Sequence, residues 1–316
     1  MSTPALHRPA PEDGKRSYRA NGRLAATFLV VQFGQLLVLP LWLLPTNAAW
    51  GWLLLPSVLL TNSWWAFIHD GVHGTLFPGK AFNRLAGRVN AVLYGAPFDL
   101  LRRGHLLHHA FSRTTRERSE VYVPGRDNHL LFSLDYYFRL CGGIYYSEVA
   151  GGLAFLLPWP AIRALMRRLS KDTNLVEPIA MRILKPTTLP AVRTDVVLIL
   201  ACYGLAFALY GAHAWMLAAA LAGRALLISL VDNLFHYGTT LDNTHYARNL
   251  ALPGWASRLI LHFNLHGLHH LHPDLPWWQL PRVHADGQMG YQGRWLPAML
   301  DQFHGTIQEQ RLRQPA

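Results

Sequence analysis

Three clusters of histidines in this chain have the spacing of metal ligands. They are His69 with His73, His105 with His108 and His109, and His266 with His269 and His270. On a helix, side chains three and four positions apart share one face, so each cluster can aim its imidazoles at a common point. Because neutral imidazole is the commonest metal ligand in proteins, the repeated spacing indicates a metal centre. The alternative, that these are ordinary core or surface histidines with no shared role, explains the repeated spacing less well.

These eight histidines are more than one metal ion uses. A tetrahedral zinc takes four protein ligands in a structural site, and three plus water in a catalytic one. The sequence therefore predicts two metal ions. Imidazole suits iron, copper, nickel and zinc alike, so the residue types leave the element open. The chain has only two cysteines, Cys141 and Cys202, which excludes a disulfide framework or a thiolate-bound cluster.

The composition favours a membrane protein. Of the 316 residues, 51% are hydrophobic and only 15% are charged, against roughly 25% charged residues in soluble domains. The net charge of +11 would suggest nucleic-acid binding in a soluble chain. Here, however, 5 of the 29 Lys and Arg lie in residues 1–23 and 16 lie in 71–192, while the links 45–49 and 211–214 carry none. This asymmetry is typical of membrane topology, and no nucleic-acid partner is predicted.

Four apolar runs must position the histidines. Leu24–Leu44 and Trp50–Ile68 flank the link 45–49, and Val196–Leu209 and Ala214–Leu234 flank the link 211–214. About 20 apolar residues are enough to cross a bilayer as a helix. Two such hairpins leave all three clusters and both termini on one side. The positive charge of that side predicts that it is the cytoplasm, with the protein a multi-pass integral membrane protein.

The remaining segments have weaker patterns. Residues 1–23 are polar and predict a disordered cytoplasmic tail, residues 24–285 form the membrane domain, and residues 286–316 form a C-terminal tail. Leu85–Leu101 and Val149–Leu165 have the pattern of interfacial amphipathic helices, although core helices of a soluble domain have the same periodicity.

We expect the third histidine cluster to lie on a helix over Leu259–Leu271, and we expect Pro273 to end that helix. His262 and His272 flank this cluster, and we expect both to pack or to lie at the surface. Arg224 is a charge inside a predicted membrane helix, so it either faces a substrate channel or pairs with a polar neighbour.

The three clusters, their order and their placement after two hydrophobic hairpins resemble the membrane fatty acyl desaturase superfamily. Its relatives include fatty acyl hydroxylases, carotenoid ketolases and alkane hydroxylases, and the likeness covers about residues 24–285. It implies an all-α integral membrane fold, with four transmembrane helices in two hairpins and a cytoplasmic helical cap that carries a di-metal site. It also implies two iron ions, Fe2+/Fe3+, held by nine histidines. The matching positions are His69, His73, His105, His108, His109, His236, His266, His269 and His270.

The chain departs from the family pattern at two places. The family has an Asn four residues before the ninth histidine, whereas this chain has Asp232, with Asn233 beside it. A carboxylate there could bind metal directly or could orient His236. Many members also carry an Asp-Pro after the second cluster, where this chain has Ser119 and Glu120.

The resemblance implies an oxidoreductase that uses O2 as co-substrate and removes hydrogen from an unactivated carbon. The chain has no nucleotide-binding glycine motif, haem-attachment motif or cysteine cluster. A separate electron donor of the ferredoxin, rubredoxin or cytochrome b5 type is therefore expected. We expect a desaturase that acts on an acyl-lipid or an acyl-CoA. The alternatives are a carotenoid ketolase or hydroxylase and another membrane di-iron hydroxylase. Outside the enzymes, a histidine-rich membrane protein could also be a haem-binding protein or a metal transporter, but the ligands of a transporter should lie near the bilayer midplane.

Overall fold

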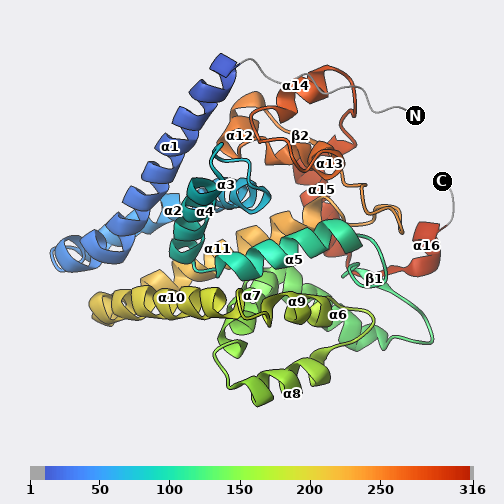
Figure 1. Ribbon diagram of the computed structural model, residues 1–316, viewed down its shortest axis with the longest axis horizontal. Coiled ribbons are helices and arrows are strands. Elements are labelled where there is room, and N and C mark those ends of the chain that lie inside the picture. The colour runs from blue at the N-terminus through green and yellow to red at the C-terminus, as the bar shows by residue number, and fades with distance from the viewer. Residues whose placement is uncertain (1–10, 314–316) are drawn as a thin grey trace.

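The computed structural model of the chain describes residues 11–313 (Figure 1). It is 70% helical, which confirms the predicted helical class. Within the described residues, the strands are four two-residue segments that form two parallel pairs. Strand β1 (Val121–Tyr122) pairs with β4 (Ile307–Gln308), and β2 (Leu250–Ala251) pairs with β3 (Gly293–Arg294).

The first long helix, α1 (Pro11–Phe33), continues into a π-helical segment, η1 (Gly34–Leu43). The prediction of a disordered tail was wrong for residues 11–23, and residues 1–10 lie outside the described part. Asn21 explains the difference, because it is fully buried and tied to distant segments. Its Nδ2 donates to the Leu76 carbonyl at 2.8 Å, and its Oδ1 accepts from Nε1 of Trp277 at 2.9 Å.

The second apolar run is bent. It forms the 3₁₀ segment η2 (Ala48–Leu54), helix α2 (Leu55–Leu59) and helix α3 (Thr61–His73), with a bend of 44° before α3. Gly74 ends α3 in a left-handed conformation with φ of 87°, which glycine adopts without steric cost. The first histidine cluster therefore occupies the last two turns of α3.

The third and fourth runs form α10 (Leu189–Tyr210) and α11 (Ala214–Leu234), joined by the short 3₁₀ turn η4 (Gly211–His213). Nη1 of Arg224 lies 3.4 Å from the Tyr203 hydroxyl. On one straight helix these residues would be roughly 30 Å apart. The contact therefore shows that the chain reverses at η4 and that α11 packs against α10.

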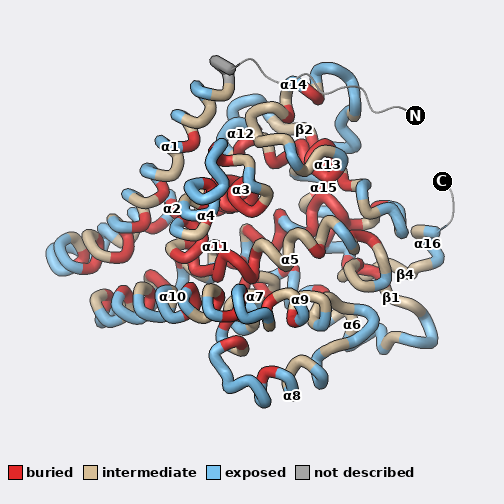
Figure 2. Tube along the Cα trace, viewed as in Figure 1, coloured by how far each residue is buried: buried red, intermediate tan, exposed pale blue. Residues whose placement is uncertain are grey.

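Within residues 11–313, two helical segments, Gly14–Leu43 and Leu189–Leu234, are long and apolar enough to cross a membrane. The bent pair Ala48–Leu59 and Thr61–His73 gives a third candidate if it is counted as one span. Large apolar side chains on these segments, such as Trp42, Trp52 and Trp215, are exposed. Along α1 and α10, Figure 2 shows buried residues alternating with exposed ones, so each helix has an inward and an outward face. The outward faces are thus suited to lipid.

Between these segments lie α4 (Lys80–Tyr94) and α5 (Phe98–Phe111), and α5 carries the second histidine cluster. The single helix expected over Leu85–Leu101 is broken at Gly95, whose φ is 101°. A Cβ there would lie 2.5 Å from the Tyr145 hydroxyl, so only glycine fits this turn.

The middle region contains α6 (His129–Phe138), the π-helical turn η3 (Arg139–Gly143), α7 (Ile144–Ala154), α8 (Trp159–Leu169) and α9 (Val176–Ile183). The helix expected over Val149–Leu165 is thus split between α7 and α8. Pro158 stands before α8, and proline restricts the preceding residue to non-helical conformations.

The last part of the chain contains many short elements. They are α12 (Gly254–Leu259), η5 (Phe263–Leu265), α13 (His266–Leu271), α14 (Leu280–Ala285), α15 (Trp295–Asp301), η6 (Gln302–His304) and α16 (Glu309–Arg313). One continuous helix was expected over Leu259–Leu271, but the structure has a break there: α12 ends at Leu259 and α13 begins at His266. The break arises because Leu261 and His262 have positive φ values of 53° and 55°, which do not occur inside a right-handed helix. The predicted C-terminal tail also packs, through β3, α15 and β4, against the body of the protein.

The largest hydrophobic cluster lies beside the histidines. It includes Trp64 and Phe67 of α3, Tyr94 of α4 and Phe235 after α11. All four side chains are almost fully buried. This packing fixes α3 and α11, the helices that lead to His69 and His236, relative to each other.

Candidate metal centre

The structure brings all nine predicted histidines together, in two groups. One, the five-histidine group, consists of His69, His73, His105, His109 and His269. The other, the four-histidine group, consists of His108, His236, His266 and His270. Within each group the candidate ligand atoms lie within 4.8 Å of one another. Each group is therefore compact enough to surround one metal ion.

Helical geometry explains how two clusters serve both groups. At 3.6 residues per turn, a residue four positions along a helix is rotated by about 40° in one direction and a residue three positions along by about 60° in the other, so the two share one face but diverge by about 100°. On α5, His105 and His109 enter the five-histidine group while His108 enters the other. On α13 the assignment is reversed, since His266 and His270 enter the four-histidine group. The two helices thus bridge both groups with opposite pairings.

In the five-histidine group, ring nitrogens of the same kind face each other. Nε2 of His105 lies 2.9 Å from Nε2 of His73 and 3.0 Å from Nε2 of His109. Burial, reinforced by neighbouring imidazoles, lowers the pKa of both His105 and His109. A neutral imidazole carries one N–H, so two Nε2 atoms that meet in this way satisfy each other only when one of them is the donor, whereas a cation between them would satisfy all of these nitrogens together.

The four-histidine group has the same character. Nε2 of His108 lies 3.2 Å from Nε2 of His270, and burial followed by neighbouring imidazoles lowers the pKa of His236 and His266. Nε2 of His236 is buried and has no hydrogen-bond partner among the described residues. An unsatisfied buried nitrogen is costly in a protein interior. The donor set therefore fits a bound metal ion.

Three of the four histidines in this group are oriented through their outer nitrogen. Nδ1 of His108 lies 2.9 Å from Oε1 of Glu117, and Nδ1 of His236 lies 3.3 Å from the hydroxyl of Ser112. Nδ1 of His270 lies 3.2 Å from the Thr244 carbonyl. Such partners fix the ring orientation and tautomer of metal-binding histidines. Each leaves Nε2 directed toward the group.

Glu117, which contacts His108, is the candidate positioning residue that the sequence analysis did not name. Burial lowers the pKa of His108, but the Glu117 carboxylate, supported by Asp232, outweighs burial and raises it. In the sequence, the one feature that could have indicated this role is that Glu117 is a carboxylate in the loop after the second histidine cluster. Glu120, which stands where many family members carry an Asp-Pro, is instead buried, pairs with Arg113 at 2.6 Å and accepts from the Gly238 N–H at 3.0 Å.

Asp232 and Asn233 differ in their surroundings. Asp232 is exposed and belongs to neither group, and no described hydrogen bond joins it to His236. Asn233 is buried, and its Nδ2 donates to Oε1 of Gln302 at 2.9 Å while its Oδ1 accepts from Ser119 at 3.3 Å. Asn233 therefore ties segments together and does not point into the metal centre.

Arg224 pairs with polar neighbours and rings. Nη2 donates to the Tyr94 carbonyl at 2.9 Å, and the guanidinium lies over the rings of Trp64, at 5.3 Å, and Tyr94, at 4.4 Å. Only 1% of this residue is exposed. These contacts agree with the polar-pairing interpretation and account for the burial of the charge.

His262 and His272 lie outside both groups, as expected. Nδ1 of His262 is 2.8 Å from the Ser257 hydroxyl, and its ring stacks on Trp277 with centroids 5.9 Å apart. His272 contacts Gln288 at 2.7 Å at the surface.

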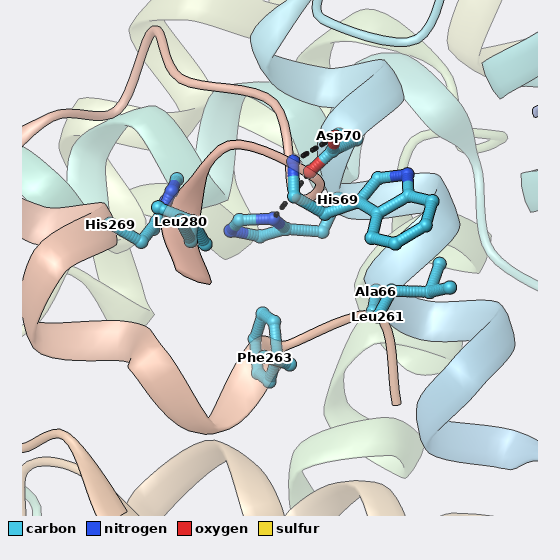
Figure 3. Close-up of a pocket in the computed structure, with 8 residues that line it drawn as sticks. Ala66, His69, Asp70, Leu261, Phe263, His269 and Leu280 are labelled. Carbon is cyan, nitrogen blue, oxygen red and sulfur yellow. Dashed lines mark hydrogen bonds and ion pairs between the residues drawn. The ribbon is translucent and has the colours of Figure 1, made fainter. Parts of the chain in front are cut away.

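A pocket adjoins the five-histidine group (Figure 3). Its walls include His69, His269 and Asp70, and the other lining residues are Ala66, Leu261, Phe263, Trp277 and Leu280. Oδ2 of Asp70 accepts a hydrogen bond from the Trp277 N–H at 3.0 Å, which holds this wall in place. The lining is mainly apolar, so the pocket suits an uncharged group next to the histidines.

The family model described as fatty acid desaturase matches residues 47–296, which include all nine histidines. No curated protein and no solved structure matches the chain. The matched region is most of the sequence and contains both histidine groups. The chain therefore belongs to the fatty acid desaturase family, whose members are oxidoreductases known for di-iron sites.

Proposed function

We propose that this protein is an O2-dependent fatty acyl desaturase that introduces a double bond into an acyl-lipid or acyl-CoA. The observation that carries the proposal is the division of nine histidines into two compact groups beside an apolar pocket. A transporter site near the bilayer midplane is disfavoured, because the first cluster lies at the very end of α3 and His236 lies just beyond α11.

The five-histidine group would hold one iron and the four-histidine group the other. When bound, the two irons would supply reductive activation of O2 with electrons from outside the chain. The chain itself orients the imidazoles. Glu117, Ser112 and Thr244 hold the outer nitrogens of three histidines, so little reorganisation is needed when metal binds.

The lining of the pocket favours an acyl substrate, although its free volume of about 10 Å³ holds no more than one water-sized group and the pocket would have to widen to admit a chain. Phe263, Leu261 and Leu280 form apolar walls next to His69 and His269. A saturated carbon placed there would be shielded from water, and its position relative to the metal centre would be fixed by packing. The substrate class proposed is therefore a lipid or fatty acyl chain.

Electrons must come from a separate protein, which has to approach the metal centre from its exposed side. The two histidine groups differ in how far they are exposed. Three members of the five-histidine group, His73, His105 and His109, are partly exposed, whereas in the four-histidine group His108 is partly exposed and the other three are buried. Arg102 and Arg103, on the same helix as His105, are also partly exposed. We infer that a small electron carrier of the ferredoxin, rubredoxin or cytochrome b5 type, with an acidic face, docks here and delivers electrons through the five-histidine group.

We further propose that the chain crosses the membrane four times and keeps both termini and the metal centre in the cytoplasm. The reversal between α10 and α11, marked by the contact of Arg224 with Tyr203, supports one hairpin. The other hairpin is supported by the bent helix pair Ala48–Leu59 and Thr61–His73, which follows the long segment Gly14–Leu43. The absence of Lys and Arg from residues 45–49 and 211–214 supports the orientation.

Lipid profiling of a host that expresses the gene tests the proposal. The wild type should produce a new unsaturated acyl species, and His105→Ala should not, although it still inserts into the membrane. His304→Ala is the matched control, because His304 is exposed and lies outside both groups. A hydroxylated or ketolated lipid in place of an unsaturated one would identify the protein as a membrane hydroxylase or carotenoid ketolase instead.

A further inference from the structure

The C-terminal residues 297–313, here named the C-terminal strap, lie beyond the region matched by the family. They nevertheless pack across α11 and β1. Strand β4 pairs with β1, and the Ile307 N–H donates to the Glu120 carbonyl at 2.7 Å. Farther on, Glu309 pairs with Arg118 at 2.5 Å. The strap is thus fastened to the loop that follows the second histidine cluster.

Gln302 is the buried centre of this strap, with no exposed surface. Its Nε2 donates to the Leu230 carbonyl at 3.0 Å, and its Oε1 accepts from Asn233 at 2.9 Å. Its own carbonyl accepts from the Tyr136 hydroxyl at 2.7 Å. A side chain with both ends satisfied in a buried site holds a single geometry, and losing it leaves several polar groups without partners.

The partners of Gln302 lead to the four-histidine group from two sides. On one side, Asn233 lies three residues before His236, and the hydroxyl of Tyr237 donates to the Gly305 carbonyl of the strap at 2.8 Å. On the other side, Asn233 accepts from Ser119 at 3.3 Å. Ser119 belongs to the loop 112–120.

That loop also supplies Ser112 and Glu117. These two residues contact the outer nitrogens of His236 and His108, respectively. The strap therefore fixes both the end of α11 and the loop whose side chains orient this group.

The orienting contacts that depend on the strap go to the four-histidine group. Ser112 and Glu117 contact His236 and His108, and among the described residues no side chain of the loop 112–120 is hydrogen-bonded to His105 or His109, although α5 carries these two as well. No described hydrogen bond joins the strap to α3, which supplies His69 and His73. We propose that Gln302 is a positioning residue for the four-histidine group alone, so that loosening it weakens one metal site and spares the other. This inference rests on the proposed di-metal centre.

The test compares full-length variants purified from membranes. Gln302→Met keeps the length of the side chain but removes its hydrogen bonds, and Glu309→Gln loosens the strap at its partly exposed end. His304→Ala is the control, because it changes an exposed residue of the same strap. Iron content is measured during titration with a chelator, and Mössbauer spectra distinguish paired from isolated iron.

The wild type and His304→Ala should hold two irons per chain. In Gln302→Met, one of the two sites should bind iron about 10- to 100-fold more weakly, as when a residue that orients a ligand is lost. Glu309→Gln should show the same selective change to a smaller extent, and it decides the question if Gln302→Met does not accumulate. Wild-type affinity at both sites in the variants that accumulate would overturn the inference while leaving the di-metal centre intact. A wild type that holds no stable pair of irons would instead overturn the proposed function, and this inference with it.

Discussion

Oε1 of Glu117 lies 2.9 Å from Nδ1 of His108, across the loop that follows α5. Among the described residues, Glu117 is the one carboxylate that forms a hydrogen bond with a histidine of either group. The contact places the Nδ1 proton of His108 toward Glu117 and leaves Nε2 facing His270. Glu117 thus links a polar surface loop to the orientation of a candidate ligand.

Replacing Glu117 should therefore weaken one metal site. Glu117→Ala removes the acceptor, and we expect about 10- to 100-fold lower metal affinity at the four-histidine group. Glu117→Gln keeps an oxygen acceptor and should lose less. Competition with a chelator under anaerobic conditions measures both. Equal affinity in wild type and Glu117→Ala would show that the contact with His108 has no role in metal binding.

The position of Asp232 gives a graded prediction. It lies one helical turn before His236, and its charge acts on His108, although no described hydrogen bond joins Asp232 to a histidine. Asp232→Asn should keep iron and some activity, because the amide can still hold a water molecule, while Asp232→Ala should lose more of both. Iron content and product yield should follow the order wild type, Asn, Ala. Full iron and activity in the Ala variant would make Asp232 a bystander.

Arg224 should matter for stability more than for substrate choice. Arg224→Leu removes the hydrogen bonds to the Tyr94 carbonyl and the Tyr203 hydroxyl, and bonds from a charged donor contribute about 1.5–3 kcal/mol each. The Tyr94 carbonyl keeps the Tyr145 hydroxyl as donor at 3.1 Å, so the loss is partial. The unfolding temperature in detergent should fall below that of Arg168→Leu, an exposed control. An altered acyl product at unchanged stability would instead place Arg224 on the substrate path.

The proposed topology can be tested by labelling. In a background without Cys141 and Cys202, Thr46→Cys and His213→Cys should react with an impermeant reagent only from the side opposite the cytoplasm. Gln310→Cys, in the exposed part of α16, should react only from the cytoplasmic side. Labelling of position 310 from the same side as position 46 would contradict four crossings.

The sequence was sufficient for the features that depend on local spacing. The placement of His105, His108 and His109 on one helix was predictable, because three- and four-residue spacing brings them to one face of α5, whereas their division between two groups was not predicted. The turn between α10 and α11 was also predictable, because Gly211 and its neighbours interrupt a long apolar run. Each of these features is decided by residues close together in the chain.

Features set by distant contacts were missed. The helical start of α1 depends on Asn21, whose partner Trp277 is 256 residues away. The break before α13 requires positive φ at Leu261 and His262, which local preference disfavours for residues other than glycine. The folded C-terminal strap depends on Gln302 meeting Asn233, 69 residues earlier. None of these pairings leaves a periodic signal in the sequence.

Metal analysis of the anaerobically purified protein tests the central claim most directly. Wild-type protein should contain two irons per chain with the Mössbauer signature of a coupled pair. His73→Ala and His236→Ala, each in a different group, should each lose iron from one site first. A wild type that binds one metal ion, or that binds zinc in preference to iron at both groups, would contradict a di-iron centre built from these nine histidines.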